Sequence, residues 1–287
     1  MFVVSGVSGN TGRVVAESLL AQRQSVTVVV REAGKGDPWR AKGASVATLS
    51  LDDTPALTDL LATAQGAYLL SPPNNAAVDL LADRGQFVDR VATAVKASGV
   101  PHIVYLSSVG AQHADGTGPI RSLHHGESVL GNAAKGVTFL RAAYFLDNWA
   151  SGVGSASGDG TLHNFLTPGR AVPMISTTDI GLFAAEHLLA PVTGPRVVEI
   201  AGPAEYTPEE IAHAFGKVLN KPVQLMTHPT EAIVPTLISF GFSPNAAGLV
   251  REMVEGINSG HVDYERNSRA FRRGTITADE AITRFFA

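Results

Sequence analysis

Short β-branched, apolar runs alternate with longer segments of helical period through the first half of the chain. One such segment, Gln86–Ser98, places its apolar side chains on one face, and Gly99 and Pro101 follow as a stop signal. Alternation of this kind predicts a parallel sheet covered by helices on both faces, with a ligand site beyond the carboxyl ends of the strands. The predicted strands are Phe2–Ser5, Ser25–Val30, Ser45–Leu49, Ala67–Leu70, His102–Leu106 and Val137–Leu140.

The pattern changes after Trp149. Ser151–Gly160 consists almost wholly of Gly, Ser and Ala, which predicts a loop or a domain seam that ligand binding orders. Ser176 is expected to cap a helix that runs through Leu189, and Val197–Ile200 is expected to form one more strand.

The segment from Thr207 to Glu210 has the form of a capping box with Pro208 at the first helical position. It predicts a helix that Asn220 ends. The rest of the chain is expected to be mostly helical.

Composition removes several classes of function. The 287 residues are 45% hydrophobic and 17% charged, which excludes general disorder. Lys and Arg number 22 against 26 Asp and Glu, so no basic excess is present to neutralise a nucleic-acid backbone. The absence of Cys excludes disulfides, thiolate nucleophiles and Cys-ligated metals, and the nine His form no HExxH arrangement, so no metal site is expected.

The N-terminal segment lacks the pattern of a secretory signal, and no apolar run approaches the ~20 residues of a membrane span. We therefore expect a cytoplasmic protein that does not bind membranes or nucleic acid directly. Its oligomeric state, monomer or homodimer, is left open.

The strongest chemical signal is a glycine loop at Ser5–Gly12, in which Gly6, Gly9 and Gly12 follow a G-x-x-G-x-x-G spacing. It lies between the first predicted strand and the helical run Val14–Gln22. Glycines let backbone amides approach a pyrophosphate, and the following helix N-terminus favours its negative charge. Turns also use glycine freely, but this position favours nucleotide binding over a structural turn.

The end of the second strand bears on the choice of cofactor. A carboxylate there holds a ribose hydroxyl, whereas a cation holds the extra phosphate of NADP. Here Arg31 directly follows the strand, and Lys35 is nearby. A phosphate-binding role for Arg31 is favoured over a role as a solvated loop cation, and this favours NADP(H) as the cofactor. Glu32 keeps NAD(H) open as an alternative.

These signals define an α/β fold class: a doubly wound, Rossmann-type parallel sheet with a smaller, mostly helical C-terminal lobe. Residues 1–150 are expected to form the dinucleotide-binding core, to which residues 175–202 return. Residues 151–174 and 203–287 are expected to form the lobe that covers the substrate.

Several further segments carry a family resemblance together with the glycine loop. They are Val29–Arg31, Leu69–Pro73, His102–Gly110, Phe139–Asn148, Thr178–Gly181 and Glu199–Pro203. On these segments the chain resembles, over nearly its whole length, the NmrA-like branch of the atypical short-chain dehydrogenase/reductases. That branch includes bacterial NAD(P)H:quinone oxidoreductases.

The resemblance implies a set of cofactor contacts. It assigns Arg31 to the adenosine phosphate, and Ser107 and Ser108 to the neighbourhood of the reacting ring. Ser50 and Leu51 stand near the adenine, where family members often carry an Asp; here Asp52 and Asp53 come shortly after. The residues assigned to the pyrophosphate and the nicotinamide side are Gly6, Ser8, Gly9, Asn10, Thr11 and Gly12, and Ser71 and Pro72, respectively.

The resemblance also implies candidate catalytic residues. Tyr144, with Phe145 and Asn148, follows a strand in the cofactor and substrate region, although core packing is an equal interpretation for the two aromatic residues. His124 and His125 stand where many members have a Lys or His that approaches a substrate oxygen, and a structural role is the alternative for each.

The usual catalytic pair of the superfamily is Tyr-x-x-x-Lys, and no tyrosine of this chain has a Lys four residues later. Ordinary ketone reduction or alcohol oxidation by that dyad is therefore disfavoured. A quinone needs less, because hydride delivered to its electron-poor ring yields a stabilised hydroquinone anion that His124, His125 or solvent can protonate. The favoured function is thus an NADPH-dependent reductase of quinones or similar electrophilic carbonyl compounds.

A second hypothesis is a non-catalytic NADP(H) sensor that changes shape or partner with the redox state of the cofactor. The missing dyad and the Ser151–Gly160 segment are compatible with it. An isomerase or reductase of the plant-phenolic type shares the glycine loop but relies on a Lys that has no counterpart here.

Overall fold

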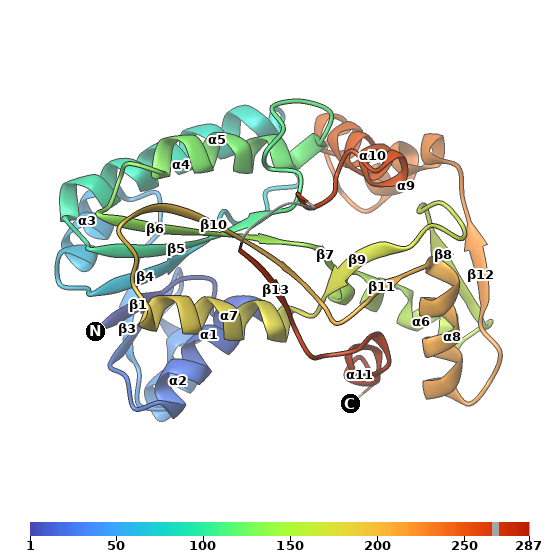
Figure 1. Ribbon diagram of the computed structural model, residues 1–287, viewed down its shortest axis with the longest axis horizontal. Coiled ribbons are helices and arrows are strands. Elements are labelled where there is room, and N and C mark those ends of the chain that lie inside the picture. The colour runs from blue at the N-terminus through green and yellow to red at the C-terminus, as the bar shows by residue number, and fades with distance from the viewer. Residues whose placement is uncertain (266–269, 287) are drawn as a thin grey trace.

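The computed structural model describes residues 1–265 and 270–286, and its largest element is an eight-stranded parallel sheet (Figure 1). The strand order β13-β10-β6-β5-β4-β1-β2-β3 reverses direction on either side of β1, as in doubly wound folds. The predicted α/β class is therefore confirmed. The strands are β1 (Phe2–Val4), β2 (Val26–Val30), β3 (Ser45–Thr48), β4 (Gly66–Leu69), β5 (His102–Ser108), β6 (Gly136–Ala142), β10 (Gly194–Ala201) and β13 (Phe271–Arg273).

Helices cover both faces of this sheet (Figure 1). Gly99 ends α4 in the left-handed conformation, as its stop signal predicts, but the helix begins at Leu80, one and a half turns before the predicted start. The Asp79 side chain caps it by accepting a hydrogen bond from Ala82 N at 3.0 Å. One face carries α3 (Thr54–Ala62), α4 (Leu80–Ser98) and α5 (Arg121–Leu130), and the other α1 (Asn10–Ala21), α7 (Thr177–Leu189), the short α2 (Asp37–Ala41) and the 3₁₀ turn η1 (Ala33–Gly36).

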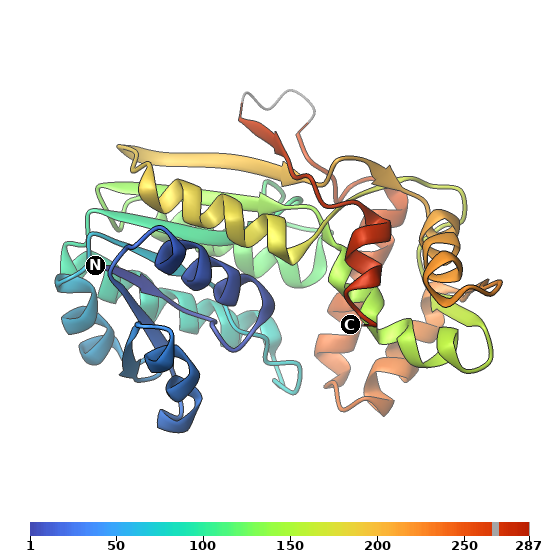
Figure 2. The ribbon, with the colours of Figure 1, turned by 90° about the horizontal axis from the view of Figure 1, so that it is seen from below.

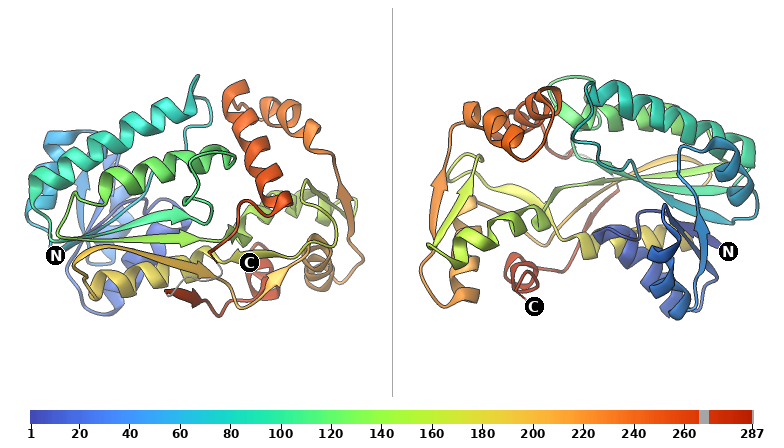
Figure 3. Two further views of the ribbon diagram at one scale, coloured as in Figure 1. Left: turned by 45° about the horizontal axis from the view of Figure 1, so that its top comes forward. Right: turned by 180° about the vertical axis from the view of Figure 1, so that it is seen from behind.

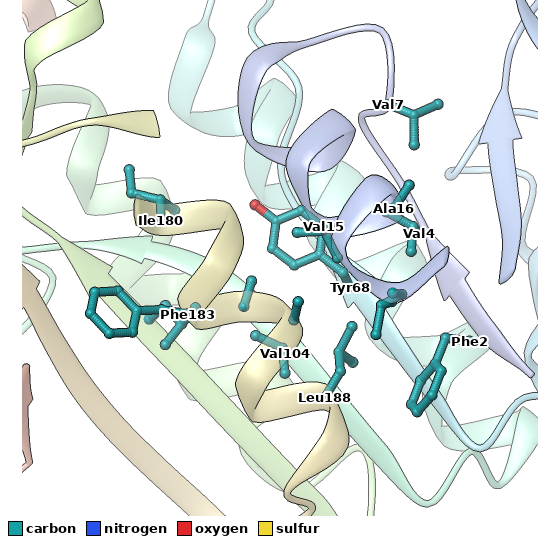
Figure 4. Packing of buried hydrophobic residues seen from close by; sticks show 14 of the residues in the cluster. Phe2, Val4, Val7, Val15, Ala16, Tyr68, Val104, Ile180, Phe183 and Leu188 are labelled. Atoms are coloured by element: carbon teal, nitrogen blue, oxygen red, sulfur yellow. The ribbon is translucent and has the colours of Figure 1, made fainter. Parts of the chain in front are cut away.

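Helices α1 and α7 pack closely against each other over the sheet (Figure 4). Gly181 on α7 makes this approach possible, because a Cβ there would lie 2.5 Å from the Cβ of Val14 on α1. Ile180 and Leu188 pack into the same buried cluster as Tyr68 of β4. The first helix, and with it the glycine loop, is thereby held rigidly on the sheet.

A second lobe lies beyond the carboxyl ends of the central strands (Figure 2). It has its own buried cluster, which includes Leu162, Met174 and Phe215. Its strands are β7 (Tyr144–Phe145), β8 (Thr161–Asn164), β9 (Val172–Ile175), β11 (Glu205–Tyr206) and β12 (Gln224–Thr227). Its helices are α6 (Val153–Ser157), α8 (Pro208–Leu219), α9 (Ile233–Ser239), α10 (Pro244–Ser259) and α11 (Ala278–Thr283), with the 3₁₀ turns η2 (Gly118–Ile120), η3 (Leu146–Gly152) and η4 (Thr230–Ala232).

The lobe is tied to the sheet half near the start of α4 (Figure 3). Leu80 N donates to the side chain of Asn245 at 2.9 Å, and Ser243 N donates to Asn75 O at 2.9 Å. The amino end of α10 is thereby joined to the segment that leads from β4 into α4.

The predicted loop at Ser151–Gly160 is wrong for most of its length. Residues 151–157 continue η3 and form α6, and Ala156 is completely buried. A Cβ on Gly152 would lie 2.3 Å from Leu162 Cδ1, so this glycine allows close packing against β8. Low side-chain bulk predicts a loop locally, whereas here Ala156 packs into the buried cluster of the lobe.

Other local predictions are confirmed. Ser176 caps α7 by accepting from Thr178 N at 3.2 Å, and Thr207 and Glu210 form the capping box of α8, which ends at Asn220. The return strand β10 pairs in parallel with β6. One short strand, β13, falls within the range expected for the lobe but pairs with β10 in the central sheet.

Among the residues that the structure describes, no helix combines the length and the apolar character needed to cross a membrane.

Candidate functional site

Three adjoining hollows run along the carboxyl ends of the strands. The outer hollow, about 460 Å³, lies between the glycine loop, the end of β2 and the segment after β3. The middle hollow, about 560 Å³, lies between the glycine loop, the end of β5 and η2. The apolar hollow, about 360 Å³, extends beneath α10 of the lobe. Neighbouring hollows share lining residues, and one residue, Arg84, lines all three.

The glycine loop has a backbone shape that side chains would prevent. Gly6 has φ +68°, and a Cβ there would lie 2.6 Å from Leu70 Cδ2. A Cβ on Gly12 would lie 2.3 Å from Ser5 O, so only glycine allows α1 to start this close to β1. Gly9 N donates to Gly6 O at 2.9 Å and closes the turn.

The first turn of α1 is suited to bind an anion. Gly9 is its N-cap and supplies no side-chain hydrogen bond, and no acidic residue lies in the first turn. The amides there face the middle hollow, which Gly9, Asn10 and Thr11 line. Unpaired first-turn amides and the helix dipole together favour negative charge at this position.

A buried hydrogen-bond chain fixes the loop to β4. Ser5 Oγ donates to Tyr68 O at 2.9 Å, and the Tyr68 hydroxyl donates to Thr11 Oγ1 at 2.9 Å. Burial raises the pKa of Tyr68 far above its usual value, against the effect of the Thr11 hydrogen bond, so the phenol stays protonated. These bonds position the Thr11 side chain and leave no ionised group under the loop.

Most of the predicted adenosine-side residues line the outer hollow. Arg31, Ser50 and Leu51 lie there together with Ser8. Lys35 does not, because its Nζ forms an ion pair with Glu32 at 3.1 Å on the exposed surface. The structure therefore brings one of the two predicted cations to this hollow.

The outer hollow also has a residue pair that sequence reasoning missed. Arg90 on α4 lines it, and Arg90 Nη2 lies 3.3 Å from Asp52 Oδ2. The Ser50 hydroxyl donates to the same carboxylate, and this bond, together with Arg90, keeps the pKa of Asp52 below its usual range despite partial burial. The signal lay in the helical period of α4, which turns Arg84, Phe87 and Arg90 toward the hollows.

The middle hollow is lined by four of the predicted nicotinamide-side residues and by part of the glycine loop. These residues are Ser71, Pro72, Ser107 and Ser108, and Gly6, Gly9, Asn10 and Thr11. The four nicotinamide-side residues come from the ends of β4 and β5, so the parallel sheet brings them to one edge. Ser107 donates to Glu127 Oε1 at 2.6 Å. Ser71 Oγ is buried and has no hydrogen-bond partner among the described residues.

Beneath Ser107 lies a group of buried charges. Arg141 on β6 donates to Glu127 through Nε at 2.9 Å and through Nη2 at 2.7 Å, and its Nη1 lies 3.0 Å from Glu265 Oε2. Burial opposes the charge of Arg141, but the hydrogen bonds and the carboxylates outweigh it and raise the pKa of Arg141. The guanidinium and Glu127 therefore remain a charged pair below the site.

Tyr144, Phe145 and Asn148 line the apolar hollow, as the resemblance implies. Burial raises the pKa of Tyr144, while a hydrogen bond with Asn148 acts in the opposite direction. The sequence did not single out the residues that the lobe contributes, because nothing in their local pattern distinguishes them from ordinary core. They are Val172, Pro173, Val250, Met253, Ile257 and Val262.

His124 and His125 lie elsewhere. His125 Nε2 lies 2.8 Å from Asp89 Oδ1 on α4, and His124 Nδ1 lies 2.8 Å from Ala111 O. Leu123 lines the middle hollow, and a helix turns by about 100° per residue, so the next two side chains turn away from it. Neither imidazole lines the hollows formed by the described residues, and their catalytic role has no support in this geometry.

The fold is that of a doubly wound α/β protein, with hollows along the carboxyl ends of its strands. Comparison with known families places the chain further. Residues 1–269 match the model of the NmrA-like family. The chain belongs to that family, and the resemblance inferred from its motifs is confirmed.

Curated relatives and solved structures are similar over most of the chain. Quinone oxidoreductase 2 of Escherichia coli is 24% identical over 293 residues, which cover 100% of this chain and 99% of the relative. The NAD(P)H azoreductase of Xenophilus azovorans is 22% identical over 253 residues, or 88% of this chain and 86% of the relative. The crystal structure of an NADPH-dependent quinone oxidoreductase from E. coli in complex with NADPH is 22% identical, with a TM-score of 0.84 over 100% of both chains.

Proposed function

We propose that this protein is an NADPH-dependent oxidoreductase that reduces quinones or similar electrophilic carbonyl compounds. The observation that carries the proposal is the continuity of the three hollows. A glycine cradle for a diphosphate leads, through the middle hollow, to an apolar chamber large enough for a small aromatic ring system. The E. coli and Xenophilus relatives, named for quinone and azo reduction with NAD(P)H, support the same reaction class.

The residues present fit a dinucleotide. A Cβ at Gly6 would overlap Leu70 and one at Gly12 would overlap Ser5 O, so only glycine gives the loop this shape. The first-turn amides of α1 have no side-chain cap. In this proposal the pyrophosphate is held by that turn, and Arg31 binds the extra phosphate of NADP. Ser71, Ser107 and Ser108 then border the nicotinamide side of the middle hollow.

When bound, the reduced nicotinamide supplies a hydride. The chain's own residues hold the acceptor against it in a chamber with a mostly apolar lining, to which the lobe contributes α10 and the segment around Val172. Tyr144, with its raised pKa, stays a neutral phenol there and contributes shape and a hydroxyl, without charge. We assign residues 151–174 and most of 203–287 to this covering role.

The test is direct. Purified protein is titrated with NADPH and NADH, and cofactor oxidation is then followed with menadione, a benzoquinone and an azo dye as acceptors. We expect tight NADPH binding and oxidation that depends on a quinone. NADPH binding without oxidation above background by any acceptor would contradict the enzyme and favour a sensor.

A further inference from the structure

Arg84 is a cation at the centre of the site that has no partner among the described residues. It lies on α4, and its Nε is buried with no hydrogen-bond partner among the described residues. No hydrogen bond or ion pair joins its guanidinium to the described part of the chain. It is also the residue at which the outer, middle and apolar hollows meet.

The neighbouring charges are already engaged elsewhere. Asp83, the adjacent residue, accepts a hydrogen bond from Asn74 Nδ2 at 3.0 Å. Arg90 on the same helix has Asp52 as its partner, and Arg141 has Glu127. Burial lowers the pKa of Arg84, and Tyr105 and Asp83 only partly oppose this. A partly buried guanidinium with five donors is normally paired, so its missing partner is expected to come from a bound molecule.

A second unmet polar group lies close by. Ser71 Oγ is buried without a partner among the described residues, and Ser71 and Arg84 both line the outer and the middle hollows. Buried polar groups are nearly always hydrogen-bonded in folded proteins. Two unmet groups on the walls of the same hollows therefore indicate polar ligand atoms at this point.

The apolar hollow defines what else the ligand must be. Among the described residues that line it, Arg84 is the only charged one, and most of the others are aliphatic or aromatic. A ligand that fills this chamber needs an apolar body. Any oxygen atom on the side of the ligand that faces α4 would lie next to the guanidinium of Arg84. A carbonyl oxygen that becomes anionic during reduction fits this arrangement, because the guanidinium stabilises negative charge at the edge of the apolar chamber.

We propose that Arg84 binds the acceptor oxygen on which negative charge develops during reduction. The inference rests on the proposed function, and it names the group that takes the place of the missing Tyr-x-x-x-Lys dyad in stabilising that charge.

The chemistry balances without a further reactant. Addition of a hydride to a quinone transfers two electrons and one hydrogen, so the quinone becomes a hydroquinone monoanion while NADPH becomes NADP⁺. Arg84 stabilises the anion by charge and hydrogen bonding and does not give up a proton. Solvent supplies the proton that completes the hydroquinone as it leaves.

The test separates anion binding from turnover. Protein saturated with NADP⁺ is titrated by calorimetry with lawsone, a hydroxynaphthoquinone that is an anion at neutral pH, and with menadione, a neutral naphthoquinone. Arg84→Met removes the charge at similar volume, and Arg84→Lys restores a cation. Lys96→Met is the matched control, because it removes from the same helix an exposed cation that lines none of the three hollows.

Arg84→Met should weaken lawsone binding by at least about ten-fold, while menadione and NADPH binding change by less than about three-fold. Its kcat with menadione should fall by about 100-fold, the loss typical of one oxyanion donor, and Arg84→Lys should recover part of both effects. Lys96→Met should leave lawsone binding unchanged.

Equal lawsone binding by wild type and Arg84→Met would overturn the proposal. So would a loss of NADPH affinity as large as the loss of lawsone affinity, since Arg84 would then serve the cofactor. Absence of NADPH oxidation in the wild type would instead overturn the proposed function, and the lawsone titration would still decide whether Arg84 binds an anion.

Discussion

The hydroxyl of Ser107 donates a hydrogen bond of 2.6 Å to Glu127 Oε1, the oxygen that also accepts from Arg141 Nε at 2.9 Å. Ser107 ends β5 on the wall of the middle hollow, whereas Glu127 lies on α5. Because the hydroxyl hydrogen points to the carboxylate, only the lone pairs of Ser107 face a ligand. We therefore expect Ser107 to accept a hydrogen bond, for instance from a carboxamide, and not to protonate a substrate.

Removal of the Glu127 charge should destabilise the fold. Glu127→Gln leaves the buried Arg141 with Glu265, whose side chain is 56% exposed, and we expect the free energy of unfolding to fall by about 3 kcal/mol. Urea unfolding measures this change. Lys217→Met, which removes an exposed pair with Asp279, is the control and should cost less than about 1 kcal/mol. Equal losses in the two variants would contradict the importance of the buried pair.

Gly12→Ala should damage both the fold and the cofactor site. The new methyl group would lie 2.3 Å from Ser5 O, and relief of this overlap requires α1 to move away from β1. We expect a loss of about 1–3 kcal/mol in unfolding free energy, with NADPH affinity reduced further because the cradle is displaced. The matched control is Gly34→Ala, where a Cβ meets no atom within 4 Å. Unchanged NADPH binding by Gly12→Ala would argue against the loop as the diphosphate site.

Arg31→Ala should discriminate between the two cofactors. Arg31 is exposed on the rim of the outer hollow, where it can reach a phosphate on the adenosine ribose. Loss of a charge-assisted contact should weaken NADPH by about 1–3 kcal/mol and leave NADH nearly unchanged, as fluorescence titration can measure. Lys35→Ala should have a smaller effect, since Lys35 is paired with Glu32. Similar losses for NADPH and NADH would refute the assignment of Arg31.

Stability should decrease in mild acid because of His102. This imidazole is fully buried in β5, where its Nε2 lies 3.2 Å from Thr138 Oγ1, and burial, reinforced by nearby His187, lowers its pKa to about 4. The imidazole of His102 binds a proton near pH 6.5 in the unfolded chain and only near pH 4 in the folded chain. The free energy of unfolding is therefore at its full value above pH 6.5, and it decreases as the pH falls toward 4.

By pH 5 the loss should reach about 2 kcal/mol relative to pH 7, measured by urea unfolding at both pH values. In His102→Gln, where no proton can bind at this position, the difference between the two pH values should shrink by a similar amount. A variant as sensitive to acid as the wild type would assign the effect to other groups.

Much of the sheet half could be predicted from the sequence because its signals are local. The six predicted strands of the first half all form. Gly6 and Gly9 lie between the first strand and the first helix, and Gly12 lies in the first turn of that helix. Capping residues such as Ser176 and Thr207 act within one helical turn. Short-range geometry of this kind depends on neighbours in the chain, so pattern alone reveals it.

The site itself depends on contacts between distant residues. Arg84, Ser107 and Met253 meet at the middle hollow from α4, β5 and α10, and no spacing in the chain records that meeting. His125 is the opposite case. The sequence predicted it as a catalytic residue, but its side chain turns toward Asp89 on α4 and away from the hollow. Side-chain direction follows from helix rotation and packing, which composition does not contain.

Local sequence thus determined the alternating strands and helices, the glycine cradle and the cation at the end of β2, because backbone conformation and capping are decided within a few residues. Tertiary structure alone decided that residues 151–157 form a helical segment with Ala156 in the core, and that Phe271–Arg273 complete the central sheet. It also decided that the guanidinium of Arg84, unpaired among the described residues, faces an apolar chamber. Each of these outcomes depends on burial and pairing between segments far apart in the chain, whose free energy exists only once the chain has folded.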